Sequence, residues 1–292
     1  MDINQVGSLE TLNDQKQISR RMAKTLDRLS SGALVNSAKE DPIKWNDLQG
    51  LKSAIGRMQA YSENLQRGAG SVRIALDTLE VSAGHLDEVK IVLESGLAAP
   101  QGSRARTTAL ERYNELHGLL DDLASPKDLG ARKLLDDPAR FPAAGPVHVA
   151  AGENGFEIIL KNQPIHTGAG GLNLPLAGDP LPDDPSGSPL VADPASASDE
   201  EIGNLIRQVG YARELVSQKS EALAVDAGAI EFAESSNAAF IEHSESTISD
   251  LNVPDVEAEA VLAQALSIRN SLATYGLSGF EETKRLVLSL IQ

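Results

Sequence analysis

The chain has 292 residues, no cysteine and a formal net charge of −16 at neutral pH. This acidity argues against binding to nucleic acid or to an anionic membrane, because both require a basic surface. The missing cysteines exclude disulfides, cysteine-ligated zinc, iron–sulfur clusters and thiol nucleophiles. Aromatic residues make up only 3% of the chain, so we expect an aliphatic core between packed helices.

The beginning of the chain carries an amphipathic helical pattern. Apolar residues recur there at intervals of mostly three or four, at Ile3, Val6, Leu9, Leu12, Ile18, Met22, Leu26 and Leu29. The same segment lacks the basic and apolar regions of a cleaved signal peptide, and no run of 18 apolar residues occurs in the sequence. We therefore expect no membrane span, and any export without a cleaved signal.

A seven-residue repeat follows between residues 48 and 93. Its main apolar positions are Leu51, Met58, Leu65, Val72, Leu79, Leu86 and Leu93. The repeat predicts a helix about 69 Å long with the seam of a coiled coil. A second helical pattern then stops at Ser125-Pro126, and it is short enough to fold back on the first. Its apolar positions are Leu110, Tyr113, Leu116, Leu120 and Leu123.

Residues 136–201 have a different composition. They hold ten of the fourteen prolines, with 11 acidic and two basic side chains. Within them, residues 145–150 and 156–160 flank Glu153-Asn154-Gly155, which predicts a β-hairpin. Leu172-Asn173-Leu174 suggests a third short strand, and residues 176–198 read as a solvated loop.

Helix is predicted again from Ser198, where Ser198-Asp199-Glu200-Glu201 has the spacing of a capping box. The seven-residue repeat returns at Ile202, Val209, Val216, Leu223, Ile230 and Leu251, with polar residues at Asn237 and Ser244. A last apolar stripe follows the rhythm of three and four at Ala258, Val261, Ala265, Ile268, Leu272 and Tyr275, and continues at Phe280, Val287 and Leu290.

These patterns predict a mainly α fold. Two long helical segments on either side of a β-rich insertion favour an antiparallel, coiled-coil-like rod, with both termini at one end and the insertion at the other. Each terminal stripe lacks a core of its own, so we expect it to bury its apolar face on the other stripe or on neighbouring molecules. The five histidines lack metal-binding spacing, and no acid, base and nucleophile converge, so we expect no enzyme, metal or cofactor.

Three segments resemble one known family. Residues 26–42, which read LDRLSSGALVNSAKEDP, resemble the signature near the start of bacterial flagellins. Residues 287–292 (VLSLIQ) are similar to the flagellin terminus, and residues 128–135 (DLGARKLL) resemble the segment that leads into its variable region. The similarity covers about the first 135 and the last 95 residues.

The resemblance implies a structural subunit that polymerises into the extracellular flagellar filament for motility. It implies terminal helices (1–42 and 253–292) that are disordered in the monomer and pair as an inner tube on assembly. A helical rod (43–135 and 199–252) would surround that tube, and the insertion (136–198) would face outward. It also implies type III export without a cleaved signal. The implied partners are further copies, an export chaperone at the C-terminal helix, and the hook-junction and cap proteins.

The resemblance also implies which residues take part in assembly. Arg28, Glu40 and Asp41, around the Ser30-Ser31-Gly32 turn, would lie where the inner tube joins the rod, and Gly32 can adopt a positive φ there. The alternative for this loop is an ordinary connection between two helices. The assembly candidates are Leu26, Arg28, Leu29, Ser30, Ser31, Gly32, Asn36, Asp41, Ile268, Leu272, Val287, Leu288, Leu290 and Ile291.

Two other functions remain open. The hook–filament junction protein of the same superfamily shares the rod and the terminal stripes, and Pro42 is shared with that type. Asn36-Ser37-Ala38 and the ending Leu288-Ser289-Leu290-Ile291 favour flagellin instead. The second alternative is a binding module of residues 136–198 displayed on a helical stalk, but that segment contains few aromatic residues for stacking on sugars.

Overall fold

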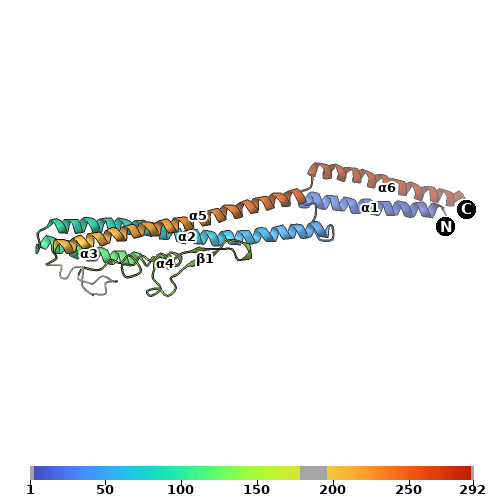
Figure 1. Cartoon of the computed structure of the whole chain (residues 1–292). Coiled ribbons are helices and arrows are strands. Elements are labelled where there is room, and N and C mark those ends of the chain that lie inside the picture. The colour runs from blue at the N-terminus through green and yellow to red at the C-terminus, as the bar shows by residue number, and fades with distance from the viewer. Residues whose placement is uncertain (1–2, 178–195, 291–292) are drawn as a thin grey trace. The chain divides into compact units, whose positions relative to one another are not determined.

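The computed structural model describes residues 3–177 and 196–290. Six α-helices and a two-stranded sheet occur in this part of the chain (Figure 1). The helices are α1 (Ile3–Ser31), α2 (Pro42–Ala98), α3 (Arg104–Leu123), α4 (Leu129–Leu135), α5 (Asp199–Asn252) and α6 (Val256–Leu290), and the strands are β1 (Val147–Ala150) and β2 (Glu157–Leu160). The predicted class, a mainly α helical rod with a small β insertion, is confirmed.

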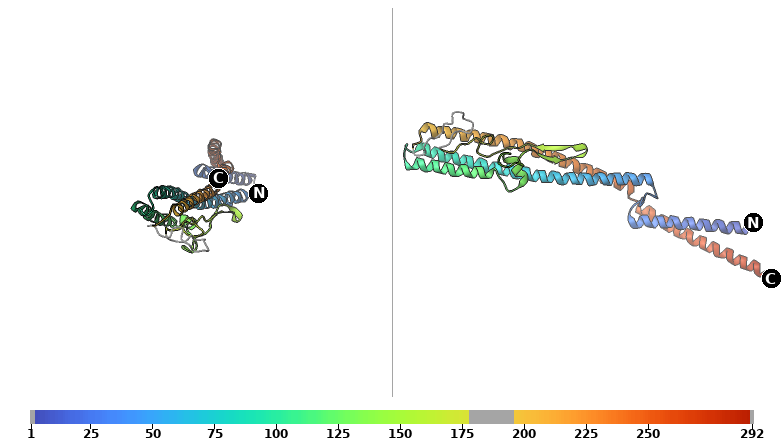
Figure 2. Two further views of the ribbon diagram at one scale, coloured as in Figure 1. Left: turned by 60° about the vertical axis from the view of Figure 1, so that its left-hand side comes forward. Right: turned by 90° about the horizontal axis from the view of Figure 1, so that it is seen from below.

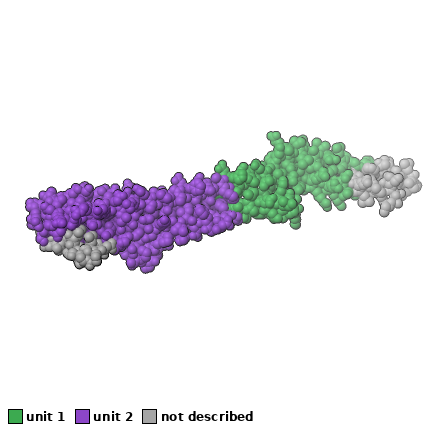
Figure 3. All heavy atoms as spheres, in the orientation of Figure 1, with its two compact units in different colours: residues 1–56, 241–292 green, residues 57–240 purple. Residues whose placement is uncertain are grey.

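The chain divides into two compact units (Figure 3). Residues 1–56 and 241–292 form the terminal unit, and residues 57–240 form the central unit. Helices α2 and α5 contribute residues to both units. The first and last helices, α1 and α6, contact each other within the terminal unit. The two ends of the helical chain are therefore brought together, as the sequence predicted.

The core of the central unit lies between α2, α3 and α5. Helices α2 and α5 run side by side and antiparallel there, with α3 packed beside them (Figure 2). The two seven-residue repeats are the buried seams of this bundle, because aliphatic side chains at that spacing lie on one helix face. The buried seam residues are Leu65, Val72, Leu79, Leu86 and Leu93 of α2 and Ile202, Val209, Val216, Leu223 and Ile230 of α5.

The start of α5 is fixed by the predicted capping box. Glu201 N donates to Ser198 Oγ at 3.2 Å, and Ser198 N donates to Glu201 Oε2 at 2.7 Å. Each side chain thus satisfies a backbone donor that the first helical turn leaves free. The helix begins at Asp199 for this local reason.

The β-hairpin is confirmed, with Val147 paired to Leu160 and Ala150 to Glu157. The hairpin lies along α2 and α5, because Val149 and Leu160 are buried against the bundle. The absence of a side chain at Gly68 of α2 permits this approach, since an added Cβ would lie 2.8 Å from Val149 Cγ2.

The suggested strand at residues 172–174 is wrong. The amides of its two leucines donate to the carbonyl oxygens of His166 and Thr167, so they are not available to a strand ladder. Helix α3 holds the segment from the other side, because Tyr113 Oη donates to Pro175 O and His117 Nε2 lies 2.8 Å from Leu174 O. Most of the predicted loop at 176–198 lies outside the described residues.

Candidate assembly surfaces

The segment of residues 26–42 joins α1 to α2 within the terminal unit. Gly32 follows the last residue of α1 with a φ of +67°, the left-handed conformation that glycine adopts without strain. Ser30 Oγ donates to Asp27 O at 3.1 Å, and Ser31 Oγ accepts from the backbone N–H of Ala33 at 3.3 Å. These residues close the C-terminal end of the helix.

Arg28 connects α1 with the following loop and with α6. Its Nε donates to Leu34 O at 3.2 Å, and its Nη1 lies 2.8 Å from Glu259 Oε1. The side chain of Glu259 is only 10% exposed and that of Arg28 25% exposed, so this ion pair is partly shielded from solvent. One guanidinium therefore holds three parts of the terminal unit together.

The loop after Gly32 also contacts the end of α5. Leu34 N donates to Asn252 O at 2.7 Å, and Val35 N donates to Asn252 Oδ1 at 2.8 Å. Val35 is buried. Because Asn252 is the last residue of α5, two successive amides of the loop fix the place where that helix ends.

The remaining signature residues shape the start of α2. Asp41 Oδ1 accepts from Lys44 N at 3.1 Å, which is the bond of an N-cap residue. Glu40 Oε2 accepts from Asn36 N at 2.7 Å. Within the single chain, Asn36 and Asp41 thus act as parts of a connection between two helices.

Helix α6 has two opposite faces with different surroundings. Glu259 and Leu266 are buried on the packed face, and Ala263, Asn270 and Ala273 are half-buried there. The predicted apolar stripe lies on the other face. Its large side chains are 56–76% exposed, at Val261, Ile268, Leu272 and Tyr275. Helix α1 is therefore covered by the less apolar face of α6, and the apolar stripe has no cover within the described chain.

Helix α1 contributes a mixed surface. Thr25 is buried, Leu29 is half-buried and Leu26 is 47% exposed. Of the predicted assembly residues near the C-terminus, Ile268 and Leu272 lie on the exposed stripe. Val287, Leu288 and Leu290 fall in α6, but their side chains are not described. Ile291 lies outside the described residues.

A groove with basic walls lies between α1 and α6. Arg21, Lys24 and Arg28 come from α1 and Arg269 comes from α6, and the groove has a volume of about 260 Å³. Its remaining lining is formed by Thr25, Leu262, Ala265 and Leu266.

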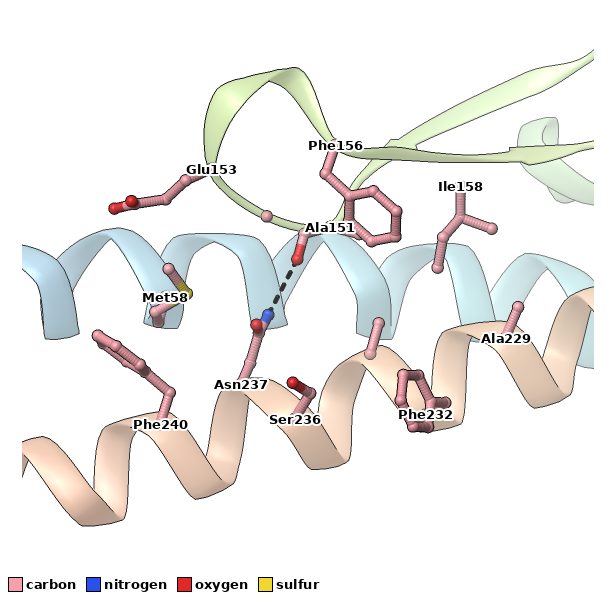
Figure 4. Close-up of a pocket in the computed structure, with 12 residues that line it drawn as sticks. Met58, Ala151, Glu153, Phe156, Ile158, Ala229, Phe232, Ser236, Asn237 and Phe240 are labelled. Atoms are coloured by element: carbon pink, nitrogen blue, oxygen red, sulfur yellow. Dashed lines mark hydrogen bonds between the residues drawn. The ribbon is translucent and has the colours of Figure 1, made fainter.

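A second groove, of about 480 Å³, lies in the central unit beneath the hairpin tip (Figure 4). Phe156 of the hairpin and Phe232 and Phe240 of α5 line it, together with Met58 of α2. The hairpin tip is held in place there by Asn237 Nδ2, which donates to Ala151 O at 3.2 Å. The groove is mainly apolar, and its three phenylalanines are exposed.

No group of three or more histidine, aspartate or glutamate side chains is placed to hold a metal ion in residues 3–177 and 196–290. Over the same residues, no helix is long and apolar enough to span a membrane.

A helical rod whose last helix exposes its apolar face has the features of a structural, assembling protein. Residues 3–139 match the family model described as the bacterial flagellin N-terminal helical region. This match supports a bacterial flagellin-type protein. Members of this family are structural subunits, not enzymes, and they self-assemble into the extracellular flagellar filament.

Sequence reasoning missed two residues that organise the terminal unit. Glu259 pairs with Arg28 across 231 positions of sequence, and no local pattern signals such a pair. Asn252 had a usable signal, because it stands two residues before Pro254, where a helix must end.

Proposed function

We propose that this chain polymerises into the helical flagellar filament and that the exposed stripe of α6 drives assembly. The observation that supports this is the outward orientation of Val261, Ile268, Leu272 and Tyr275 in the single chain. A large apolar side chain contributes about 1.5–3 kcal/mol when it is fully removed from water. When a neighbouring subunit covers the stripe, each of these side chains that it buries stabilises the assembly by a contribution of this kind.

Assembly and ordering of the terminal helices are one coupled event in this proposal. Fixing the backbone costs about 1–2 kcal/mol per residue. Among the side chains that the structure describes, few large apolar ones are buried between α1 and α6 to offset this cost. Neighbouring subunits supply the missing apolar surface. This supports the assignment of residues 1–42 and 253–292 to an inner tube, with a rod of residues 43–135 and 199–252 around it and residues 136–198 facing outward.

The remaining partners follow from the same surface. A stripe that must stay exposed until polymerisation needs protection inside the cell, which supports an export chaperone on residues 253–292. In this proposal, export through the flagellar type III channel carries the subunit out of the cell. The hook-junction and cap proteins would contact the two ends of the polymer.

Electron microscopy of the purified full chain, with filament seeds or a precipitant, tests the proposal. We expect micrometre filaments from the wild type and none from Ile268→Ser/Leu272→Ser or from a chain without residues 1–30. Tyr211→Ser/Val225→Ser is the matched control, because it removes equally exposed apolar side chains from the central unit. Filaments from the α6 variant at the wild-type concentration would contradict the proposed role of the stripe.

The same experiment distinguishes the alternative within the superfamily. A hook–filament junction protein forms a thin ring and not a long polymer. If the wild type forms rings or short oligomers under conditions in which another flagellin polymerises, the chain is a hook–filament junction protein instead.

A further inference from the structure

The basic groove between α1 and α6 concentrates positive charge in an acidic chain. Residues 16–28 carry five basic side chains and one acidic side chain, whereas the whole chain has a net charge of −16. Three of those five line the groove, and Arg269 faces them from α6. Like charges held this close repel one another unless an anionic group lies among them.

Part of this charge is not compensated within the chain. Arg28 is paired with Glu259 at 2.8 Å, and Lys24 Nζ lies 4.0 Å from Glu40 Oε1. Arg21 and Arg269 form no ion pair with any residue that the structure describes. Two guanidinium groups at the groove are therefore available to an anionic partner.

A segment with uncompensated negative charge lies in the same unit. Residues 242–257 contain five acidic side chains and neither lysine nor arginine. All five are exposed, and none forms an ion pair within the described residues. They are Glu242, Glu245, Asp250, Asp255 and Glu257.

We infer that the basic groove of one subunit binds the acidic segment 242–257 of a second copy of this chain. Charge complementarity selects this occupant, because Arg21 and Arg269 of the groove and the carboxylates of the segment form no ion pair within the described residues. The groove and the segment have no residue in common, so in this inference one subunit uses both at once. Such a heterologous contact generates an open polymer when the rotation between subunits does not close a ring.

This inference rests on the proposed function and names the contact that aligns the subunits. The stripe of α6 supplies apolar free energy without a fixed register. Pairing of Arg21 and Arg269 with carboxylates determines which residues meet and suppresses wrong alignments. Because these groups are exposed, the contact weakens as salt screens it, with a Debye length of about 10 Å at 0.1 M.

Charge reversal tests the contact through the critical concentration for polymerisation, measured by sedimentation and electron microscopy. The groove variant is Arg21→Glu/Arg269→Glu, and the segment variant is Glu242→Lys/Glu245→Lys. We expect each variant alone to raise the critical concentration at least tenfold at low salt. An equimolar mixture should restore polymerisation, because the reversed side chains of one variant then meet the reversed side chains of the other.

The matched control is Lys16→Glu/Arg20→Glu, which makes the same change of charge on α1 outside the groove. We expect it to polymerise at nearly the wild-type concentration. Circular dichroism of each monomer checks that helix content is unchanged.

Three results would overturn the inference alone. Wild-type filaments together with an unchanged critical concentration for the groove variant would remove the groove from assembly while leaving the proposed function intact. An equal loss in the control would assign the effect to overall charge. Loss without rescue in the mixture, with inhibition of the wild type by inorganic phosphate at constant ionic strength, would assign the groove to a free anion. Failure of the wild type to polymerise would instead reject the proposed function and the inference with it.

Discussion

Arg28 and Glu259 lie 231 residues apart in the chain, and their side chains meet at 2.8 Å in the terminal unit. The pair joins the end of α1 to the beginning of α6. It lies beside the loop of residues 33–41, whose amides bind the last residue of α5. The signature segment therefore links α1, α5 and α6 within a single chain.

We predict that Arg28→Met weakens the contact between α1 and α6. The substitution leaves the nearly buried carboxylate of Glu259 without its partner, which should cost about 1–3 kcal/mol given the partial exposure of the pair. Hydrogen exchange of α1 amides in the assembled filament should become faster. Arg28→Met/Glu259→Leu should recover part of the loss, and Arg20→Met is the exposed control. Equal exchange in Arg28→Met and the wild type would refute the role of the pair.

Arg106 is predicted to stabilise the end of the central unit at which α2 leads into α3. It is buried, and its guanidinium donates to acceptors at the end of α2, in the turn that follows α2, and at the start of α5. These acceptors are the carbonyl oxygens of Gly96, Leu97, Ala99 and Ala197 and the carboxylate of Asp199.

The substitution Arg106→Lys keeps the charge but replaces a planar fork of donors with a single ammonium group. We expect a loss of about 2–4 kcal/mol and a melting temperature lower by roughly 5–15 °C. Arg104→Lys, at an exposed position two residues earlier, should change the melting temperature little. If both variants melt alike, the buried guanidinium does not stabilise the turn.

Two glycines of α2 should respond in opposite directions to alanine. At Gly70 no atom lies within 4 Å of an added Cβ, so Gly70→Ala should stabilise the helix by about 0.5–1 kcal/mol. At Gly68 the new methyl group would collide with Val149, so Gly68→Ala should destabilise by about 1–3 kcal/mol. Thermal unfolding measures both, and Gly68→Ala/Val149→Ala should restore stability. Stabilisation by both single substitutions would contradict close packing of the hairpin on α2.

The stability of the central unit should fall in acid partly through Asp136. Burial raises the pKa of this carboxyl, but hydrogen bonds from Ser125 Oγ, Asp137 N and Arg132 Nε outweigh burial and hold the pKa below its ordinary value. The folded state therefore binds this proton less readily than the unfolded state. The resulting stability is present above the unfolded pKa of about 3.9 and is lost as the pH falls through the folded pKa.

The substitution Asp136→Asn tests this by melting temperature between about pH 2 and pH 6. At neutral pH it should cost about 1–3 kcal/mol, because hydrogen bonds to a charged acceptor are lost. Its melting temperature should depend less on pH than that of the wild type. Asp122→Asn, an exposed neighbour, should keep the wild-type pH dependence. An unchanged slope in Asp136→Asn would show that this carboxyl does not contribute.

Much of the fold was predictable because its determinants are local. The repeat that includes Leu65 and Leu79 marks a buried seam without knowledge of the partner helix, since spacing alone places those residues on one face. The capping box at Ser198 and the hairpin around Asn154-Gly155 involve residues only a few positions apart. The third strand failed because Leu172 and Leu174 find acceptors at His166 and Thr167, and a strand-like pattern cannot reveal that competing loop.

The sequence by itself determined the helices, their caps, the hairpin and the flagellin-type signature, since each depends on neighbouring residues. Only the tertiary structure decided which face of α6 covers α1. The stripe of Ile268 and Leu272 was predicted to be buried on the other stripe or on neighbouring molecules, and in the single chain it is exposed. Arg28 of α1 pairs with Glu259 of α6, which is distant in sequence, and this pair turns the face of α6 that carries Glu259 toward α1. The apolar face of α6 is therefore left exposed. Such a choice depends on contacts between residues that are distant in sequence, and helical periodicity carries no information about them.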